Sequence, residues 1–321
     1  MERETMTPLA ASYRAALSTA ARDALLRRRR PQSLPARTLL VHDHVIGEDL
    51  AAAYAGLFPA TGPLDPGDLP SVLVHIAGFP AAMDLMAQAD FPMPLLGMVH
   101  LENRVRHHRP VPAGVPLEVA ASATGLAPHP AGTTVDLVIT VHGPDGDQPG
   151  EGPVLLWEGT STYLGRGVRL AGHPRVDRRP REAFAAPELT ARWRLPASTG
   201  RDYAAVSGDY NPIHLHPLAA RALGQKGMIA HGMYLAGRML AGREPAGAGH
   251  SWSISFATPV LLPGSVSLGV THSGAGTARV TEVTAWNARS GKPHFTGRIE
   301  PGERPTAIRR PRSSGRPWRP S

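Results

Sequence analysis

Two apolar helical stretches, about 150 residues apart, constrain the fold of this chain more than any other feature of its sequence. The first is 72–86 (VLVHIAGFPAAMDLM) and the second is 228–240 (MIAHGMYLAGRML). Each is apolar nearly all round, so each must be enclosed by the rest of the fold. The spacing is too long for a solenoid and suits a duplicated domain. The sequence therefore predicts two similar units, each built around one buried helix.

Segments in which apolar and polar residues alternate follow each helix, and this alternation predicts strands. They cover 104–109, 117–123, 134–141 and 154–164 in the first half, and 253–258, 266–272, 278–287 and 294–299 in the second. A curved antiparallel sheet wrapped around the central helix would bury that helix. We therefore expect a duplicated α+β fold. A single α+β domain, with chance similarity between its halves, is the alternative.

The domain organisation follows from these segments and from composition. We expect an N-terminal domain at 37–166 and a C-terminal domain at 184–300, joined by an Arg- and Pro-rich linker at 167–183. Residues 1–36 read as an extension with an amphipathic helical pattern at 9–26. The tail 301–321 is rich in Pro, Arg, Ser and Gly, a composition typical of disorder.

Composition excludes several classes of function. Cysteine is absent, which excludes disulfides, thiolate zinc sites and a cysteine nucleophile. The net charge is +8, and the basic residues cluster at the two ends and in the linker without a nucleic-acid motif. That distribution favours an acidic small molecule or carrier as partner over nucleic acid. The sequence shows neither a membrane-spanning stretch nor a secretory signal, so we expect a cytoplasmic protein.

The stretch 203–220 (YAAVSGDYNPIHLHPLAA) carries the strongest chemical signal. Its Ser-Gly-Asp-x-Asn-Pro core is turn chemistry, and a helix cannot continue through Pro212 without a break. We expect Asp209 and His214 to lie on an ordered, non-helical loop. A carboxylate beside an imidazole can share one water and pass protons in both directions.

A glycine at the start of the second apolar helix supplies a complementary feature. In 229–233 (IAHGM), Gly232 would let a ligand approach the backbone closely. N–H groups at a helix start are free to donate, and the helix dipole favours negative charge there. Gly232 is therefore a suitable donor to the enolate oxygen of a thioester.

These residues resemble the MaoC-like dehydratases, a family with the hot-dog fold that includes the R-specific enoyl-CoA hydratases. The signature is matched at every position from Tyr203 to Ala220, the sequence 230–233 lies at the usual distance, and 256–264 (FATPVLLPG) resembles the strand and turn after the helix. The resemblance covers roughly 190–300 and implies a double hot-dog fold for the whole chain.

The resemblance also implies a reaction and roles. Asp209 and His214 would activate a water, Asn211 would shape the loop, and Gly232 would hold the thioester oxygen. Ser207, His231 and Tyr203 would help form the substrate-binding part of the site. The reaction would be reversible hydration of a trans-2-enoyl thioester of CoA or acyl carrier protein, with no metal or redox cofactor.

The first half lacks the Asp-x-Asn-Pro-x-His pattern after Tyr54. It resembles a degenerate hot-dog unit whose helix would line an acyl tunnel without doing chemistry. Such a chain is a pseudo-dimer by itself and can pair again as a homodimer. A hot-dog thioesterase and a non-catalytic acyl-CoA-binding subunit are the rival functions.

Simpler interpretations exist for single residues. Asp209 could serve only as the acceptor of an Asx turn. His214, His216 and His231 could suggest a metal, but a His-x-His pair alternates faces when extended, so we expect none. Ser207 lacks the context of a nucleophile elbow. His107 and His108 have Arg neighbours on a predicted strand, so we expect both on the solvated surface.

Overall fold

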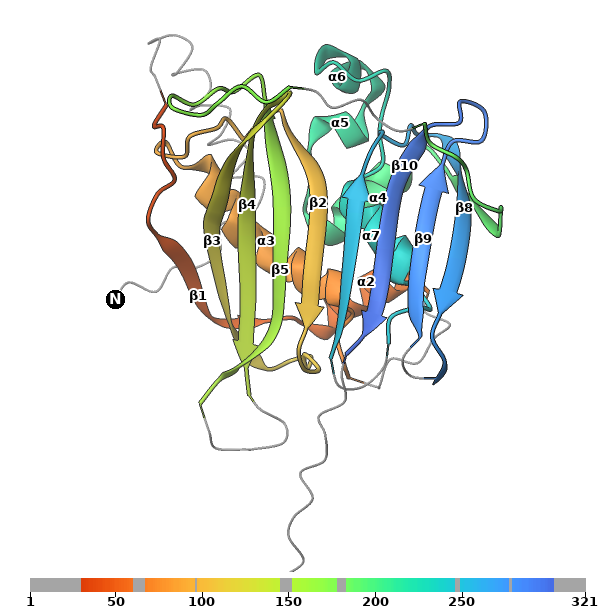
Figure 1. The fold of residues 1–321 in the computed structure, drawn as a ribbon. Helices are drawn as coiled ribbons and strands as arrows, with labels where there is room; N and C mark the ends of the chain where they lie inside the picture. Colours follow the sequence, from red (N-terminus) through yellow and green to blue (C-terminus); the bar gives the residue numbers. More distant parts are fainter. Residues whose placement is uncertain are drawn as a thin grey trace, which may run out of the picture.

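The computed structural model describes residues 30–59, 67–95, 97–144, 152–177, 183–245, 249–276 and 279–302. The helix expected at 9–26, and the tail from residue 303 onward, lie outside these ranges. Figure 1 shows the strands side by side in one sheet with the helices packed behind it. None of the helices in the described ranges is long and apolar enough to cross a membrane.

Each half of the chain supplies five strands and its own helices. The first half contains β1 (Thr38–Val45), α2 (Glu48–Leu57), α3 (Ser71–Ala87), β2 (Met98–His107), β3 (Pro116–His129), β4 (Gly132–Gly143) and β5 (Val154–Arg166). The second contains β6 (Ala191–Leu195), α4 (Thr199–Ser207), α5 (Pro212–Leu215), α6 (Pro217–Ala222), α7 (Gly232–Leu240), β7 (His250–Phe256), β8 (Gly264–Ser273), β9 (Val280–Trp286) and β10 (Pro293–Pro301).

The strand order confirms the duplication. Read from its outer edge, the first half runs β1-β3-β4-β5-β2 and the second runs β6-β8-β9-β10-β7. The two inner strands, β2 and β7, pair antiparallel, from Glu102 opposite Ser255 to His107 opposite His250. We call this ladder the central seam. Two hot-dog units thus share one ten-stranded antiparallel sheet.

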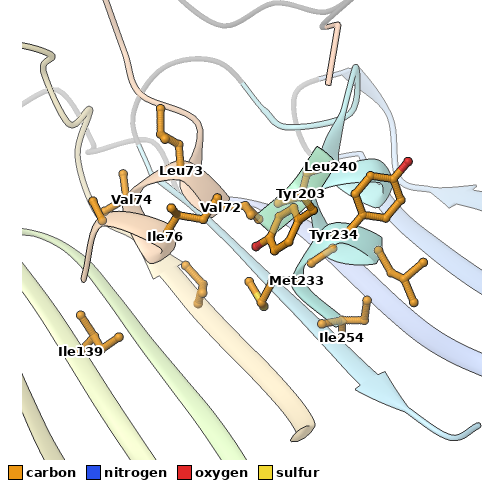
Figure 2. Close-up of a cluster of buried hydrophobic side chains, with 14 of the residues drawn as sticks. Val72, Leu73, Val74, Ile76, Ile139, Tyr203, Met233, Tyr234, Leu240 and Ile254 are labelled. Atoms are coloured by element: carbon orange, nitrogen blue, oxygen red, sulfur yellow. The ribbon is translucent and has the colours of Figure 1, made fainter. Parts of the chain in front are cut away.

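The core is continuous across the seam. Figure 2 shows α3 side chains such as Val72 and Ile76 facing Tyr203, Met233 and Tyr234 of the second half. All five are buried. Close approach of α3 to the sheet needs a glycine, because a Cβ on Gly78 would lie 2.7 Å from Ile139 Cγ2. The predicted enclosure of both apolar helices is therefore confirmed.

The structure differs from the expected secondary structure at the edge strands and at the start of the second central helix. The edge strands β1 and β6 were not predicted, because β6 has only five residues and β1 buries only one of its eight. The second central helix begins at Gly232 and not at Met228. The preceding residues are extended instead, with Ile229 bridging to Leu261 and the Ala230 N–H donating to the Val260 carbonyl at 2.9 Å.

His107 contradicts the expectation of a solvated surface. Its residue exposure is 2%, because the seam places it opposite His250 and beneath the N-terminal end of α3. His108 is partly exposed and lies 3.0 Å from Glu158 Oε1. Adjacent strand residues point to opposite faces of the sheet, so two neighbouring histidines receive opposite environments.

Candidate active site

The loop that carries Asp209 is fixed by its own main chain. Gly208 ends α4 in the left-handed conformation, at φ 71°, which glycine adopts without strain. The Asp209 N–H donates to Ser207 Oγ at 3.2 Å, and the Asn211 N–H donates to Asp209 Oδ1 at 3.2 Å. The Asx turn considered from sequence is therefore present. It engages Oδ1, and the side chain still keeps 19% of its surface exposed.

His214 lies in a helical turn, not on the non-helical loop that the sequence predicted. Pro212 interrupts the chain as expected and then occupies the first turn of α5, where no N–H is required. Asn211 caps this turn, because its Oδ1 accepts from the Ile213 N–H at 3.3 Å. A Cβ at Gly200 would collide with the His214 carbonyl oxygen, so glycine there permits α4 and α5 to touch.

The hydrogen bonds of His214 define its free nitrogen. Nδ1 lies 2.8 Å from the Ile229 carbonyl oxygen and donates to it, which leaves Nε2 as the proton acceptor. The ring stacks on His231 with a centroid separation of 3.6 Å. Burial lowers the pKa of His214 to about 3, and the neighbouring His231 lowers it further, against the opposing charge of Asp209. The imidazole is therefore neutral at pH 7.

His231 connects the Asp209 loop to the central helix. Its Nε2 donates to the Asp209 main-chain oxygen at 3.0 Å and lies 3.8 Å from Oδ2 of the same residue. Burial also lowers the pKa of His231. The Tyr203 ring packs on it with centroids 4.8 Å apart. This arrangement holds the carboxylate beside the His214 ring.

Gly232 follows immediately as the first residue of α7. The first N–H groups of a helix have no partner within it, so they are available to a ligand. A Cβ on Gly232 would lie 2.9 Å from the Phe256 ring, which explains the need for glycine. The structure thus brings Asp209, His214, His231 and the N-terminal end of α7 into one site.

Two side chains of the first half also belong to this neighbourhood, and the sequence did not indicate them. His100 stacks on Tyr163 at 4.6 Å and packs against Phe256 at 5.2 Å. Burial lowers the pKa of His100 to about 4, while the Asp209 charge acts in the opposite sense. Burial and the Asp209 charge together raise the pKa of Tyr163. Only the pairing of β2 with β7 brings these residues close.

His216 does not join the site. Its Nδ1 accepts from the Leu218 N–H at 3.3 Å, so it caps α6. Asp209, His214 and His231 do have ligand atoms within 4.8 Å of one another. The two rings, however, are stacked only 25° from parallel, so their in-plane lone pairs run side by side instead of converging on one ion. This geometry suits acid–base chemistry better than metal binding.

Two hot-dog units on one sheet, with this site at the start of the second central helix, define a double hot-dog protein. The MaoC-like domain family matches residues 180–291. The chain is 33% identical over 274 residues to 3-hydroxyacyl-thioester dehydratase X of Mycobacterium tuberculosis, covering 84% of this chain and 91% of that protein. The chain belongs to the MaoC-like dehydratase family and is a hydro-lyase.

Solved structures agree with this assignment. The crystal structure of HtdX from Mycobacterium tuberculosis is 32% identical, with a TM-score of 0.66, and covers 82% of this chain and 99% of that one. A MaoC-like dehydratase from Phytophthora capsici has a TM-score of 0.61 at 17% identity, covering 85% and 97% of the two chains. The second similarity concerns the fold alone.

Proposed function

We propose that this chain catalyses the reversible hydration of trans-2-enoyl thioesters to (3R)-3-hydroxyacyl thioesters, with CoA or an acyl carrier protein as the carrier. The observation that carries the proposal is the convergence of Asp209, the free Nε2 of His214 and the N-terminal N–H groups of α7. The dehydratase named above, which matches most of the chain, supports the same substrate class.

The proposed chemistry needs only water and protons. Asp209 and His214 bind one water, and its oxygen forms a bond to C3 as the C2=C3 double bond breaks. The electron pair moves toward the thioester oxygen, which accepts the Gly232 N–H. The water proton passes to the Asp209–His214 pair, and a proton returns from this pair to C2. The products balance without a metal or a redox cofactor.

The surrounding residues position these groups. Asn211 and Ser207 fix the Asp209 loop through the hydrogen bonds already described. His231 and Tyr203 hold the loop against α7. We place these four residues on the substrate-binding side of the site, and we propose that the buried face of α3 helps to enclose the acyl chain.

One assay distinguishes the three candidate functions. Purified protein is mixed with crotonyl-CoA, and the conjugated double bond and free thiol are followed together. Loss of the double bond without thiol supports the hydratase. Thiol release would instead identify a thioesterase, and binding with neither change would identify a non-catalytic subunit.

The cellular setting is a separate proposal. We place the protein in the cytoplasm, acting on CoA or carrier-protein thioesters of fatty acid metabolism. The chain already pairs its two halves as a pseudo-dimer. Sedimentation analysis of the purified chain would show whether it pairs again as a homodimer.

A further inference from the structure

A second cluster of histidines and carboxylates lies at the opposite end of the central seam from Asp209. It contains His107 at the end of β2, His250 at the start of β7, and Glu244 in the loop after α7. Their residue exposures are 2%, 4% and 5%. One ligand atom from each lies within 4.8 Å of the other two. The proposed hydration reaction uses none of these residues.

Three ring nitrogens of this cluster lie near a carboxylate without a hydrogen bond to it. His250 Nε2 lies 3.2 Å from Glu244 Oε1, and His107 Nδ1 lies 4.0 Å from the same oxygen. His250 Nε2 is buried without a hydrogen-bond partner. Burial lowers the pKa of His107, and the Arg109 main chain lies near enough to oppose that shift, but neither nitrogen of His107 makes a hydrogen bond of good geometry. Buried polar atoms are rarely left in that condition, because desolvation without a partner costs about 1–3 kcal/mol per group.

We propose that His107 Nδ1, His250 Nε2 and Glu244 bind a divalent transition metal ion, with zinc as the best match. Two imidazoles and one carboxylate are a common zinc ligand set. Ligand atoms of a tetrahedral zinc site lie about 3.3 Å apart when each bond is about 2.0–2.1 Å. Glu244 Oε1 lies 3.2 Å from His250 Nε2 and 4.0 Å from His107 Nδ1, close to this value, and the ligand atoms of all three residues lie within 4.8 Å of one another.

The groups around the cluster have the arrangement that orients metal ligands. Asp68 Oδ1 lies 3.8 Å from His107 Nε2, on the opposite side of the ring from Glu244. A carboxylate on this side of the ring is placed to accept a hydrogen bond from Nε2–H once the two groups approach, which would leave Nδ1 as the ligand. Glu244 Oε1 accepts the Ser71 N–H at 2.7 Å, so the ligating carboxylate is itself held by the start of α3.

The proposed ion would connect the two halves. Asp68 and His107 come from the first half, and Glu244 and His250 come from the second. The ion would therefore cross-link the seam at one end and leave the Asp209 site at the other end intact. Three protein ligands leave a fourth position for a water. All three are buried, which leaves little access for a substrate, so we assign the ion a structural role.

Metal analysis tests this proposal without relying on activity. Untagged protein is dialysed against metal-free buffer, and its zinc is measured by mass spectrometry. About one zinc per chain is expected for a single site. The variants His250→Gln and Glu244→Gln should lose it. His108→Gln, which alters the partly exposed neighbour of His107, is the matched control and should retain it. Circular dichroism checks that each variant is folded.

A second measurement uses the unmodified chain, so it does not depend on the variants folding. After chelation, zinc at about 100 times its dissociation constant should raise the Tm by roughly 5 °C. Cobalt(II) should give the visible absorption of a four-coordinate site. Absence of both zinc uptake and a cobalt spectrum would overturn the proposal. So would zinc that survives in His250→Gln and disappears in His214→Gln, since the ion would then lie at the Asp209 site.

Discussion

The two central helices begin at opposite ends of the seam, and their N-terminal ends differ in what they face. At α7, Gly232 lies beside the Asp209 loop, and the carboxylate is partly open to solvent. At α3, the Ser71 N–H already donates to the Glu244 carboxylate, which is buried. A helix start favours an anion in both cases. The start of α7 has no side-chain cap, whereas the start of α3 is filled by a side chain from the other half.

The packing around the two helix starts differs as well. The Ser71 hydroxyl accepts the indole N–H groups of Trp157 and Trp252, each at 2.8 Å. At the start of α7, Gly232 lies against the Phe256 ring. Neither side chain offers a polar group there. The α3 end is therefore closed by its own hydrogen bonds. The two related units therefore close the start of α3 with polar contacts and leave the start of α7 without them.

Acid should unfold the protein through histidines at both ends. Burial lowers the pKa to about 3 or 4 for four of them, His75, His100, His107 and His214. They are neutral in the fold, whereas the unfolded chain protonates them below about pH 6.5. Stability is therefore full above that pH and falls as pH drops from about 6.5 toward 4, by about 1.4 kcal/mol per pH unit for each histidine.

Urea unfolding at several pH values, in the presence of a chelator, measures this slope. His107→Gln and His214→Gln each remove one such histidine, one from each end of the seam. Each variant should therefore reduce the dependence of the unfolding free energy on pH by about 1.4 kcal/mol per pH unit, the contribution of one proton. A stability that is flat between pH 7 and 5 would contradict the assignment of neutral, buried imidazoles.

Substitutions at the Asp209 site should abolish most hydration. Asp209→Asn and His214→Ala are each expected to lower kcat/KM for crotonyl-CoA by at least about a hundredfold, because they remove a member of the acid–base pair. Glu244→Gln at the other helix start is the comparison. It should change kcat/KM by no more than about threefold. If Glu244→Gln lowered kcat/KM as much as the Asp209 and His214 variants do, the two helix starts would not differ in their role in catalysis.

Ser71→Ala should affect stability and leave chemistry intact. The hydroxyl accepts from two buried indoles, and its loss leaves both donors without that partner. A decrease of about 2 kcal/mol or more in the free energy of unfolding is expected. Chemical denaturation measures it. Unchanged stability would show that the α3 end is not held by this hydroxyl.

Gly232→Ala tests the corresponding position of α7. The added Cβ would press on the Phe256 ring and shift the start of the helix. We expect kcat to fall about tenfold, because one misplaced oxyanion donor weakens transition-state stabilisation. Gly227→Ala is the control, since its Cβ meets nothing within 4 Å. Similar activity in both variants would argue against a role for the Gly232 N–H.

His100→Phe should have the smallest effect of the series. The ring fills the space between Tyr163 and Phe256 and feels the charge of Asp209. Phenylalanine keeps the packing and removes the polar nitrogen, so a decrease in kcat of only about fivefold is expected from an indirect role. A shift in the pH profile would reveal electrostatic coupling. A change in KM alone would indicate that His100 acts only on binding.

The sequence predicted the turn around Asp209 correctly because its signals are local. Ser207 to Pro212 encode a turn through residues only a few positions apart, and the structure has hydrogen bonds of that range. The helical turn at His214 was missed, since a proline that stops one helix can also begin the next.

Other features depend on contacts between distant segments, and these the sequence did not reveal. His107 and His250 are 143 positions apart along the chain, yet they face each other across the seam. His100 and Tyr163 approach Asp209 only because β2 pairs with β7. No periodicity marks such residues. The Arg residues next to His107 in the sequence suggested that it lies on the solvated surface. That prediction is wrong, because His107 is buried.

By itself, the sequence determined that the chain folds as a duplicated helix-and-sheet unit and that one half carries an acid–base motif. Apolar periodicity and turn residues act over a few positions, so they can be interpreted without coordinates. The tertiary structure decided which residues meet at the two ends of the seam. Pairing register sets those meetings, and a shift of one residue would turn each side chain to the other face.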